Sequence, residues 1–290
     1  AGMYSTNALL DEAGIIHAGS GKNLQEAAAP AFYETTKGRA ALVGTHAPIW
    51  PEHNRLAATP LIGNLGGRPG LNMLNYSETI LVSQDQFDAL EQVREGFLRQ
   101  RENYDNPRPF ANASASTGIN FPASSSGRNN PNYRTVRDGE IPGTVVYDMS
   151  DIDLNRILRN IRNARQLGDF VIAAAHIHQS RSIVETQHLS TRPPAFYEEL
   201  ARKAIDAGAD AFVGTGVQTL RGIEIYNGKP IFYGLGEFFR EAQWELELAL
   251  GIADANSNRR MQQFARNFGG STQSLESLVA ISHYEDGELT

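Results

Sequence analysis

The stretch that most constrains the fold runs from residue 169 to residue 237, where two apolar segments flank a helical one. Residues 170–175 are almost wholly apolar, which predicts a parallel strand buried on both faces. A helical repeat follows between Pro194 and Gly208, and residues 211–213 form the second apolar run. This order predicts a β-α-β unit, in which ligands bind at the carboxyl ends of the strands.

Two histidines, His176 and His178, directly follow the first of these strands. Because side chains alternate along a strand, residues two apart point to the same side. We therefore expect both imidazoles at the mouth of a crevice. Imidazole titrates near pH ~6.5, so the pair is suited to proton transfer as well as to metal binding. Ordinary hydrogen-bonded histidines are the alternative interpretation of such a pair.

The flanking segments extend the same sheet. Residues 40–44 predict another strand, and it delivers His46, which we expect in the same crevice unless it is an ordinary loop histidine. Residues 223–226 and 230–233 flank an Asn-Gly pair, which is a strong signal for a hairpin. The sequence therefore predicts one largely parallel sheet that is extended by this hairpin.

Two long segments show no sustained periodicity. Residues 46–82 are predicted to be an irregular connection, in which Arg68 is a candidate anion contact or a solvated arginine in a rigid turn. Residues 102–133 are predicted to be a second long excursion, suited to cover the site. Between them, a capping box predicts a helix whose apolar stripe, residues 87–98, is expected in the core.

The two ends of the chain give weaker patterns. Residues 15–16 predict a short strand, and Asn23 is expected to cap the helix that follows. Residues 278–283 predict a strand, and residues 289–290 the start of a return strand. A helical pattern begins almost at the first residue. We expect the chain to be a fragment at both ends, built as a single domain over residues 1–290.

Composition excludes several classes of protein. The chain has 290 residues, 26 Lys plus Arg against 33 Asp plus Glu, and a net charge of −7. With no basic block, binding to nucleic acid through phosphate neutralisation is not expected. There is no apolar run that predicts a membrane span, and no signal peptide is visible. The chain has no cysteine, so thiolate catalysis is excluded, while a cytoplasmic and a cell-envelope location both stay open.

The residues from Gly208 to Phe238 resemble the CapA-type family of capsule and poly-gamma-glutamate synthesis. The resemblance rests on Gly-Thr-Gly-Val-Gln, Arg-Gly-Ile-Glu-Ile-Tyr and Tyr-Gly-Leu-Gly-Glu-Phe, in this order. Two earlier segments, around Asn23 and from Gly67 to Asn72, are similar to one branch of the family. The resemblance implies an α/β fold of the calcineurin-like metallophosphoesterase type, a layered αββα sandwich.

Departures from the family pattern affect the predicted metal site. Thr215 and Gln218 stand where the family has the two histidines of Gly-His-Gly-Pro-His, and Glu237 stands where it has asparagine. The family's N-terminal metal-binding elements, a Gly-Asp after the first strand and an Asn-His-Ala with a following Asp, are found nowhere in this chain. We therefore expect a divalent metal (Mn, Zn or Mg) to be bound weakly or not at all, through His176 and His178.

The resemblance implies a peptide-like or poly-glutamate-like substrate. In an enzyme, His176, His178 and His46 would be catalytic, either by metal-assisted hydrolysis or by acid/base proton transfer of the epimerase type. The substrate would then be bound by four further residues of the expected site, Thr215, Gln218, Arg68 and Glu237. The alternative is a non-catalytic accessory protein of an envelope-polymer pathway, with a vestigial metal site.

Overall fold

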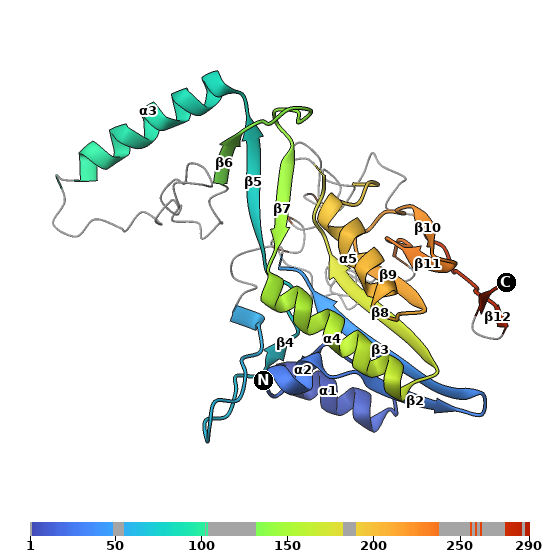
Figure 1. The fold of residues 1–290 in the computed structure, drawn as a ribbon. Helices are drawn as coiled ribbons and strands as arrows, with labels where there is room; N and C mark the ends of the chain where they lie inside the picture. The colour runs from blue at the N-terminus through green and yellow to red at the C-terminus, as the bar shows by residue number, and fades with distance from the viewer. Residues whose placement is uncertain are drawn as a thin grey trace.

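The computed structural model describes residues 2–48, 55–101, 103, 132–181, 190–237, 256, 259, 262, 276–285 and 288–290. Figure 1 shows these elements in space. The helices are α1 Gly2–Glu12, α2 Leu24–Ala28, α3 Gln84–Arg101, α4 Asp151–Leu167 and α5 Ala195–Asp206. The strands are β1 Ser20–Gly21, β2 Ala31–Thr35, β3 Gly38–His46, β4 Gly70–Leu71, β5 Tyr76–Val82, β6 Asn132–Thr135, β7 Val145–Met149, β8 Phe170–Ile177, β9 Ala211–Gly216, β10 Ile223–Tyr226, β11 Lys229–Phe232, β12 Tyr284–Glu285 and β13 Glu288–Leu289.

The central element is a six-stranded sheet in the order β10-β11-β9-β8-β3-β2. Strands β3, β8, β9 and β11 run parallel, and the antiparallel strands β2 and β10 form the two edges. The predicted strands at 40–44, 170–175 and 211–213 thus lie in one largely parallel sheet, as expected. The hairpin prediction is also confirmed, because Asn227 and Gly228 have the positive φ values of 50° and 74° that a type I′ turn requires.

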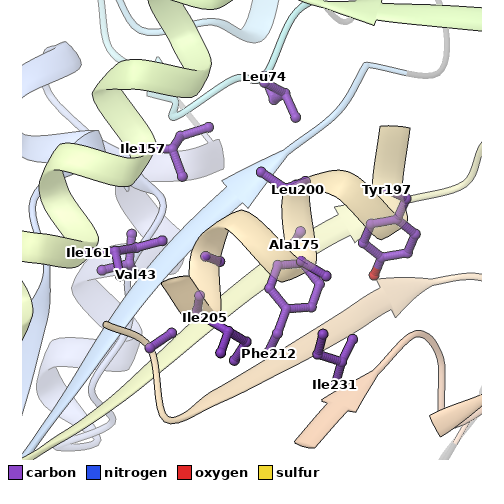
Figure 2. Packing of buried hydrophobic residues seen from close by; sticks show 14 of the residues in the cluster. Val43, Leu74, Ile157, Ile161, Ala175, Tyr197, Leu200, Ile205, Phe212 and Ile231 are labelled. Atoms are coloured by element: carbon purple, nitrogen blue, oxygen red, sulfur yellow. The ribbon is translucent and has the colours of Figure 1, made fainter. Parts of the chain in front are cut away.

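One face of this sheet packs against helices α4 and α5. Along β8, this face presents Val171, Ala173, Ala175 and Ile177, each at most 3% exposed. Figure 2 shows side chains of the two helices and the strands meeting in this core. Complete burial of a single leucine such as Leu200 contributes about 1.5–3 kcal/mol. This layer holds the carboxyl ends of the strands in fixed positions.

The opposite face of the sheet is less covered than the sequence predicts. Burial along β8 alternates, and Phe170, Ile172 and Ala174 on this face are only half-buried. Tyr284 packs edge-on against Phe170, with ring centroids 4.8 Å apart. The expectation of a strand buried on both faces is therefore wrong for β8 among the described residues. The run is apolar throughout, but its two faces have different surroundings.

A helical layer on a largely parallel sheet, with a second sheet beside it, is a layered α/β arrangement, so the predicted fold class is confirmed. The second sheet has the order β6-β5-β7. Its strand β5 corrects the prediction of an irregular connection over residues 46–82, because the last seven of those residues pair with β7 and β6. Because its partner strands follow 50 or more residues later, no local sequence pattern indicated this pairing.

Helix α3 follows β5 of the second sheet and projects away from the rest of the molecule in Figure 1. Phe87 and Leu90 pack on the small cluster of Ile80, Val82 and Val145. Further along the same stripe, the side chains of Val93 and Phe97 are 51% and 50% exposed. The prediction that the whole stripe lies in the core is therefore wrong for its second half.

The second sheet carries a paired arginine and glutamate. In β6, Arg134 donates through both terminal nitrogens to the carboxylate of Glu140, at 2.6 and 2.7 Å. These hydrogen bonds, together with the backbone N–H of Arg137, lower the pKa of Glu140 to about 2. The pair closes the turn between β6 and β7.

The predicted helix caps are confirmed. Asn23 accepts a hydrogen bond from the N–H of Glu26, and Ser83 and Gln86 form the reciprocal bonds of a capping box. The short strand expected at residues 15–16 is absent, and that segment is irregular in the part of the chain that the structure describes. Residues 278–283 likewise form no strand; the predicted turn back is found just after them, where β12 pairs antiparallel with β13. Most of the predicted excursion at 102–133 lies outside the described residues.

Candidate functional site

A row of polar side chains crosses the carboxyl ends of three adjacent parallel strands. His46 in β3 is in register with His176 in β8, which is in register with Thr215 in β9. The rings of His46 and His176 stack, with centroids 5.3 Å apart and an interplanar angle of 26°. The predicted convergence of these residues at one rim of the sheet is therefore seen in the structure.

His176 and His178 are joined directly. The Nε2 atoms of the two rings lie 2.9 Å apart, and Nδ1 of His176 lies 3.0 Å from the hydroxyl of Thr215. If Nδ1 carries a proton and donates it to Thr215, Nε2 of His176 is left to accept the proton of His178. The pair is then held in the arrangement of a donor beside an acceptor.

The backbone of β9 makes room for His178. Gly216 has φ +109°, a conformation that side-chain-bearing residues rarely adopt, and a Cβ atom there would lie 3.1 Å from the His178 ring. Because β8 ends at Ile177, His178 belongs to the loop, and its ring rests on this glycine. Gly216 therefore permits the close approach of the two histidines.

His46 is fixed by a segment from outside the sheet. Its N–H donates to the carbonyl of Asn72 at 3.1 Å, and its carbonyl accepts from Leu74 at 2.9 Å. The hydroxyl of Thr45 also donates to the Asn72 carbonyl, at 2.9 Å, and the Asn72 side chain donates to Gly44 at 2.9 Å. The end of β3 is thereby held on both sides, by β8 and by residues 72–74.

Helix α4 in turn holds this segment. Arg156 donates through Nε to the Asn72 side chain at 3.1 Å, and its guanidinium also contacts Met73 and Asp153. Asp153 accepts from the N–H and the side chain of Asn75 at 3.0 and 2.7 Å. The sequence analysis did not find this network, because its partners are about 80 residues apart and only the Asn72 motif had been noticed.

The cavity at the histidines has a volume of about 340 Å³. It is separate from a cavity of about 460 Å³ that lies outside this site. Most of the residues that line this cavity are small, and no described lining residue is an aspartate, glutamate, lysine or arginine. They are Ala18, Gly19, Ser20, Gly44, Thr45, His46, Leu71, Ala174, Ala175, His176 and Thr215. The cavity can admit a slender polar chain next to the imidazoles.

Buried polar side chains support the loop that follows His178. Gln179 is 1% exposed and donates to the carbonyl of Pro48 at 3.0 Å and to the hydroxyl of Tyr76 at 2.6 Å. Arg221, 4% exposed, donates to the carbonyls of Ser190 and Gln179 at 3.0 and 2.8 Å. Burial raises the pKa of Tyr76, so it stays a neutral hydroxyl. Arg221 lies in the Arg-Gly-Ile-Glu-Ile-Tyr motif, but it was not expected to have this role.

Comparison with known proteins identifies the family. Residues 1–242 match the model described as bacterial capsule synthesis protein PGA_cap. The chain belongs to this family. The proteins y4sH and y4uA of Sinorhizobium fredii, both described as uncharacterized, are each 37% identical over 308 residues, which cover 99% of this chain and 60% of theirs. The PGA biosynthesis protein CapA of Bacillus subtilis is 36% identical over 84 residues, 29% of this chain and 20% of its own length.

The PGA_cap assignment confirms the resemblance seen in the sequence. The chain spans 60% of the length of the two Sinorhizobium relatives. Within the PGA_cap chain, Thr215 occupies a position where the family pattern has histidine, and here its hydroxyl lies within hydrogen-bond distance of His176. No helix in the described part of the chain has the length and apolar character that crossing a bilayer requires.

His178 contacts His176 but is not among the residues that line the histidine cavity, and three further predicted site residues also lie outside it. Arg68 donates through Nε and a terminal nitrogen to the carbonyl of Ala57, at 3.2 and 2.9 Å, and thus closes its own loop. Gln218 and Glu237 are half-buried in the loops after β9 and β11. None of the three lines the cavity that His46, His176 and Thr215 share. Their expected role in substrate binding stays a prediction.

The donor set at this rim suits at most a weak metal site. Two ligands with bonds of about 2.05 Å lie ~2.9 Å apart at the right angle of an octahedral site but ~3.3 Å apart in the tetrahedral geometry of zinc, so the 2.9 Å separation of the two Nε2 atoms matches the octahedral case. Contact of Nδ1 with Thr215 is the kind of second hydrogen bond that orients a ligating histidine. Among the described residues, however, no group of three or more His, Asp or Glu side chains is placed to hold a metal ion.

Proposed function

We propose that this PGA_cap protein acts on a peptide-like or poly-gamma-glutamate-like substrate, and that His176 and His178 transfer the proton in the reaction. The observation that carries the proposal is the 2.9 Å contact between the two Nε2 atoms, with Nδ1 of His176 at Thr215. One imidazole accepts a proton while its neighbour holds one, so the pair can serve as base and acid within one site.

The surroundings support this role. The rings stand at the carboxyl ends of β3 and β8, over a cavity whose floor of Gly44 and Ala174 leaves the substrate backbone close to the imidazoles. Among the described lining residues, the side chains that can exchange or orient a proton are His46, His176 and the hydroxyls of Ser20, Thr45 and Thr215. Proton transfer at a peptide α-carbon needs no strong metal site, which agrees with the small donor set.

Metal-assisted hydrolysis is a second candidate, favoured by the separation of the Nε2 atoms. His176 and His178 would hold a divalent cation (Mn, Zn or Mg), and the cation would supply Lewis acidity beside the substrate. The two imidazoles would be ligands in this case and proton carriers in the first case. In both, the hydroxyl of Thr215 lies within hydrogen-bond distance of Nδ1 of His176 and orients its ring, and Gly216 gives His178 its position.

Deuterium exchange separates the two candidates. The intact chain is incubated in D₂O with poly-gamma-glutamate and with glutamate-containing peptides, with EDTA or with added Mn²⁺. Mass spectrometry then measures deuterium at the α-carbon and the release of shorter products. Proton transfer predicts exchange that survives EDTA, whereas hydrolysis predicts cleavage that depends on Mn²⁺.

Histidine variants provide the control. His176→Ala and His178→Ala are each expected to lower the rate about 10²–10⁴-fold, the usual contribution of a general acid or base. His283→Ala is the matched control, because His283 is exposed and outside the cavity. Full activity of the folded His176 and His178 variants would refute the proposal. Substrate binding without exchange or cleavage would instead support an accessory role.

A further inference from the structure

A second cavity lies between α2 and α4, which pack side by side (Figure 1). Its volume is about 660 Å³, within the range of ~300–1,000 Å³ that is typical of ligand sites. It shares no lining residue with the histidine cavity. The residues that line it are Leu24, Gln25, Ala28, Ala29, Pro30, Pro60, Ile152, Asn155, Arg156, Arg159 and Asn160. We call this cavity the α2–α4 groove.

The charge of the α2–α4 groove is opposite to that of the chain. The whole sequence has a net charge of −7, but the described residues of the lining include two arginines and no aspartate or glutamate. Arg156 forms an ion pair with Asp153, which offsets its charge, and it also donates to Asn72 and Met73. Arg159 is exposed, and no carboxylate in the described part of the chain forms an ion pair with it. The groove therefore presents a guanidinium group whose charge is not neutralised by a neighbour.

Amide side chains accompany the arginines. Asn155 and Asn160 lie on α4, and Gln25 on α2 accepts the N–H of Leu61 at 3.3 Å through its carbonyl oxygen. An amide can donate to one peptide group and accept from another, and a guanidinium matches the planar geometry of a carboxylate. Alanines and prolines form the apolar wall opposite. This combination fits a peptide chain that carries carboxylates.

We propose that the α2–α4 groove binds an acidic peptide chain, with Arg159 pairing with a carboxylate and the asparagine amides contacting the peptide backbone. The proposal is argued from the lining of the groove and does not depend on the chemistry of the histidines. Nucleic acid is a poorer match, since two arginines neutralise few phosphates and the lining has no aromatic side chain for stacking.

The test measures binding of fluorescein-labelled hexaglutamate to the intact chain by fluorescence anisotropy at low salt. Hexaglutamate is expected to bind saturably and more tightly than hexaglutamine. Arg159→Gln should weaken it about fivefold, the upper range for a partly exposed ion pair. Arg162→Gln is the matched control, because Arg162 is exposed on the same helix but does not line the groove.

The proposal would be overturned if hexaglutamate did not bind saturably, or if hexaglutamine or an oligonucleotide of the same charge bound as tightly. It would also be overturned if Arg159→Gln bound hexaglutamate as tightly as the unmodified chain, or if Arg162→Gln lost as much affinity as Arg159→Gln. Repeating the comparison in the His176→Ala background separates the two sites. If the loss on Arg159→Gln persists there, the groove binds the peptide whether or not the histidines are catalytic. Loss of all binding in His176→Ala alone would place the peptide at the histidines and refute the groove.

Discussion

Replacement of Asn72 by alanine should destabilise the protein and loosen the site at the same time. Asn72 is fully buried, and its side chain makes a hydrogen bond to the Gly44 carbonyl and one with the guanidinium of Arg156. A neutral hydrogen bond contributes about 0.5–1.5 kcal/mol and one to a charged group about 1.5–3 kcal/mol. Their loss predicts a decrease of about 2–4 kcal/mol in the free energy of unfolding.

Urea unfolding followed by circular dichroism measures this change, with an unchanged slope m showing that only stability is affected. Asn163→Ala is the matched control, because Asn163 is exposed on α4 and should change stability by less than about 0.5 kcal/mol. Since the backbone of residue 72 brackets His46, the NMR signals of the His46 ring should also shift in Asn72→Ala. If Asn72→Ala costs no more than the control, the bonds that we infer to hold this segment do not stabilise it.

Three further predictions follow from the described contacts. Gly216→Ala should displace the His178 ring and lower activity, and it should also lower stability, because φ +109° disfavours a side chain and the Cβ would lie 2.9 Å from the Ile177 carbonyl oxygen; equal turnover by the two proteins would contradict the role of this glycine. Gly214→Ala should strongly destabilise the chain, because its Cβ would lie 1.8 Å from the buried Tyr197 hydroxyl, and adding Tyr197→Phe should restore part of the thermal midpoint; no rescue would disprove that clash. The pKa of Glu140 is lowered to about 2 beside its arginine partner, so its ionised form contributes stability above the unfolded pKa near ~4.3. The loss of unfolding free energy in Glu140→Gln, measured with urea, should therefore become smaller as the pH falls from about 4.5 toward 2. A loss that stays constant with pH would refute this.

Local patterns were sufficient for much of the fold. The apolar runs at 170–175 and 211–213, the Asn-Gly hairpin and the caps at Asn23 and Ser83 each involve neighbours within a few residues. Their backbone preferences and side-chain periodicity act before any distant contact forms, so the sequence displays them directly. The same alternation placed His176 at the rim of the sheet.

Pairing across long sequence distances was not visible in the same way. Strand β5 pairs with β7, whose residues follow about 70 positions later, and its polar residues hid it among loop signals. The second half of the α3 stripe is exposed although its spacing is that of a core helix. Periodicity shows that a face is apolar, but only the tertiary structure decides whether another element covers it.

The histidine site shows the same division. The sequence alone determined which imidazoles lie at the strand ends, because chain order and period-two alternation are enough for that. Only the tertiary structure paired His176 with Thr215, 39 residues away, and joined Asn72, which holds His46, to Arg156, 84 residues away. Such contacts depend on the register between strands and on the packing of α4, which are set by the whole core and leave no pattern in any short segment.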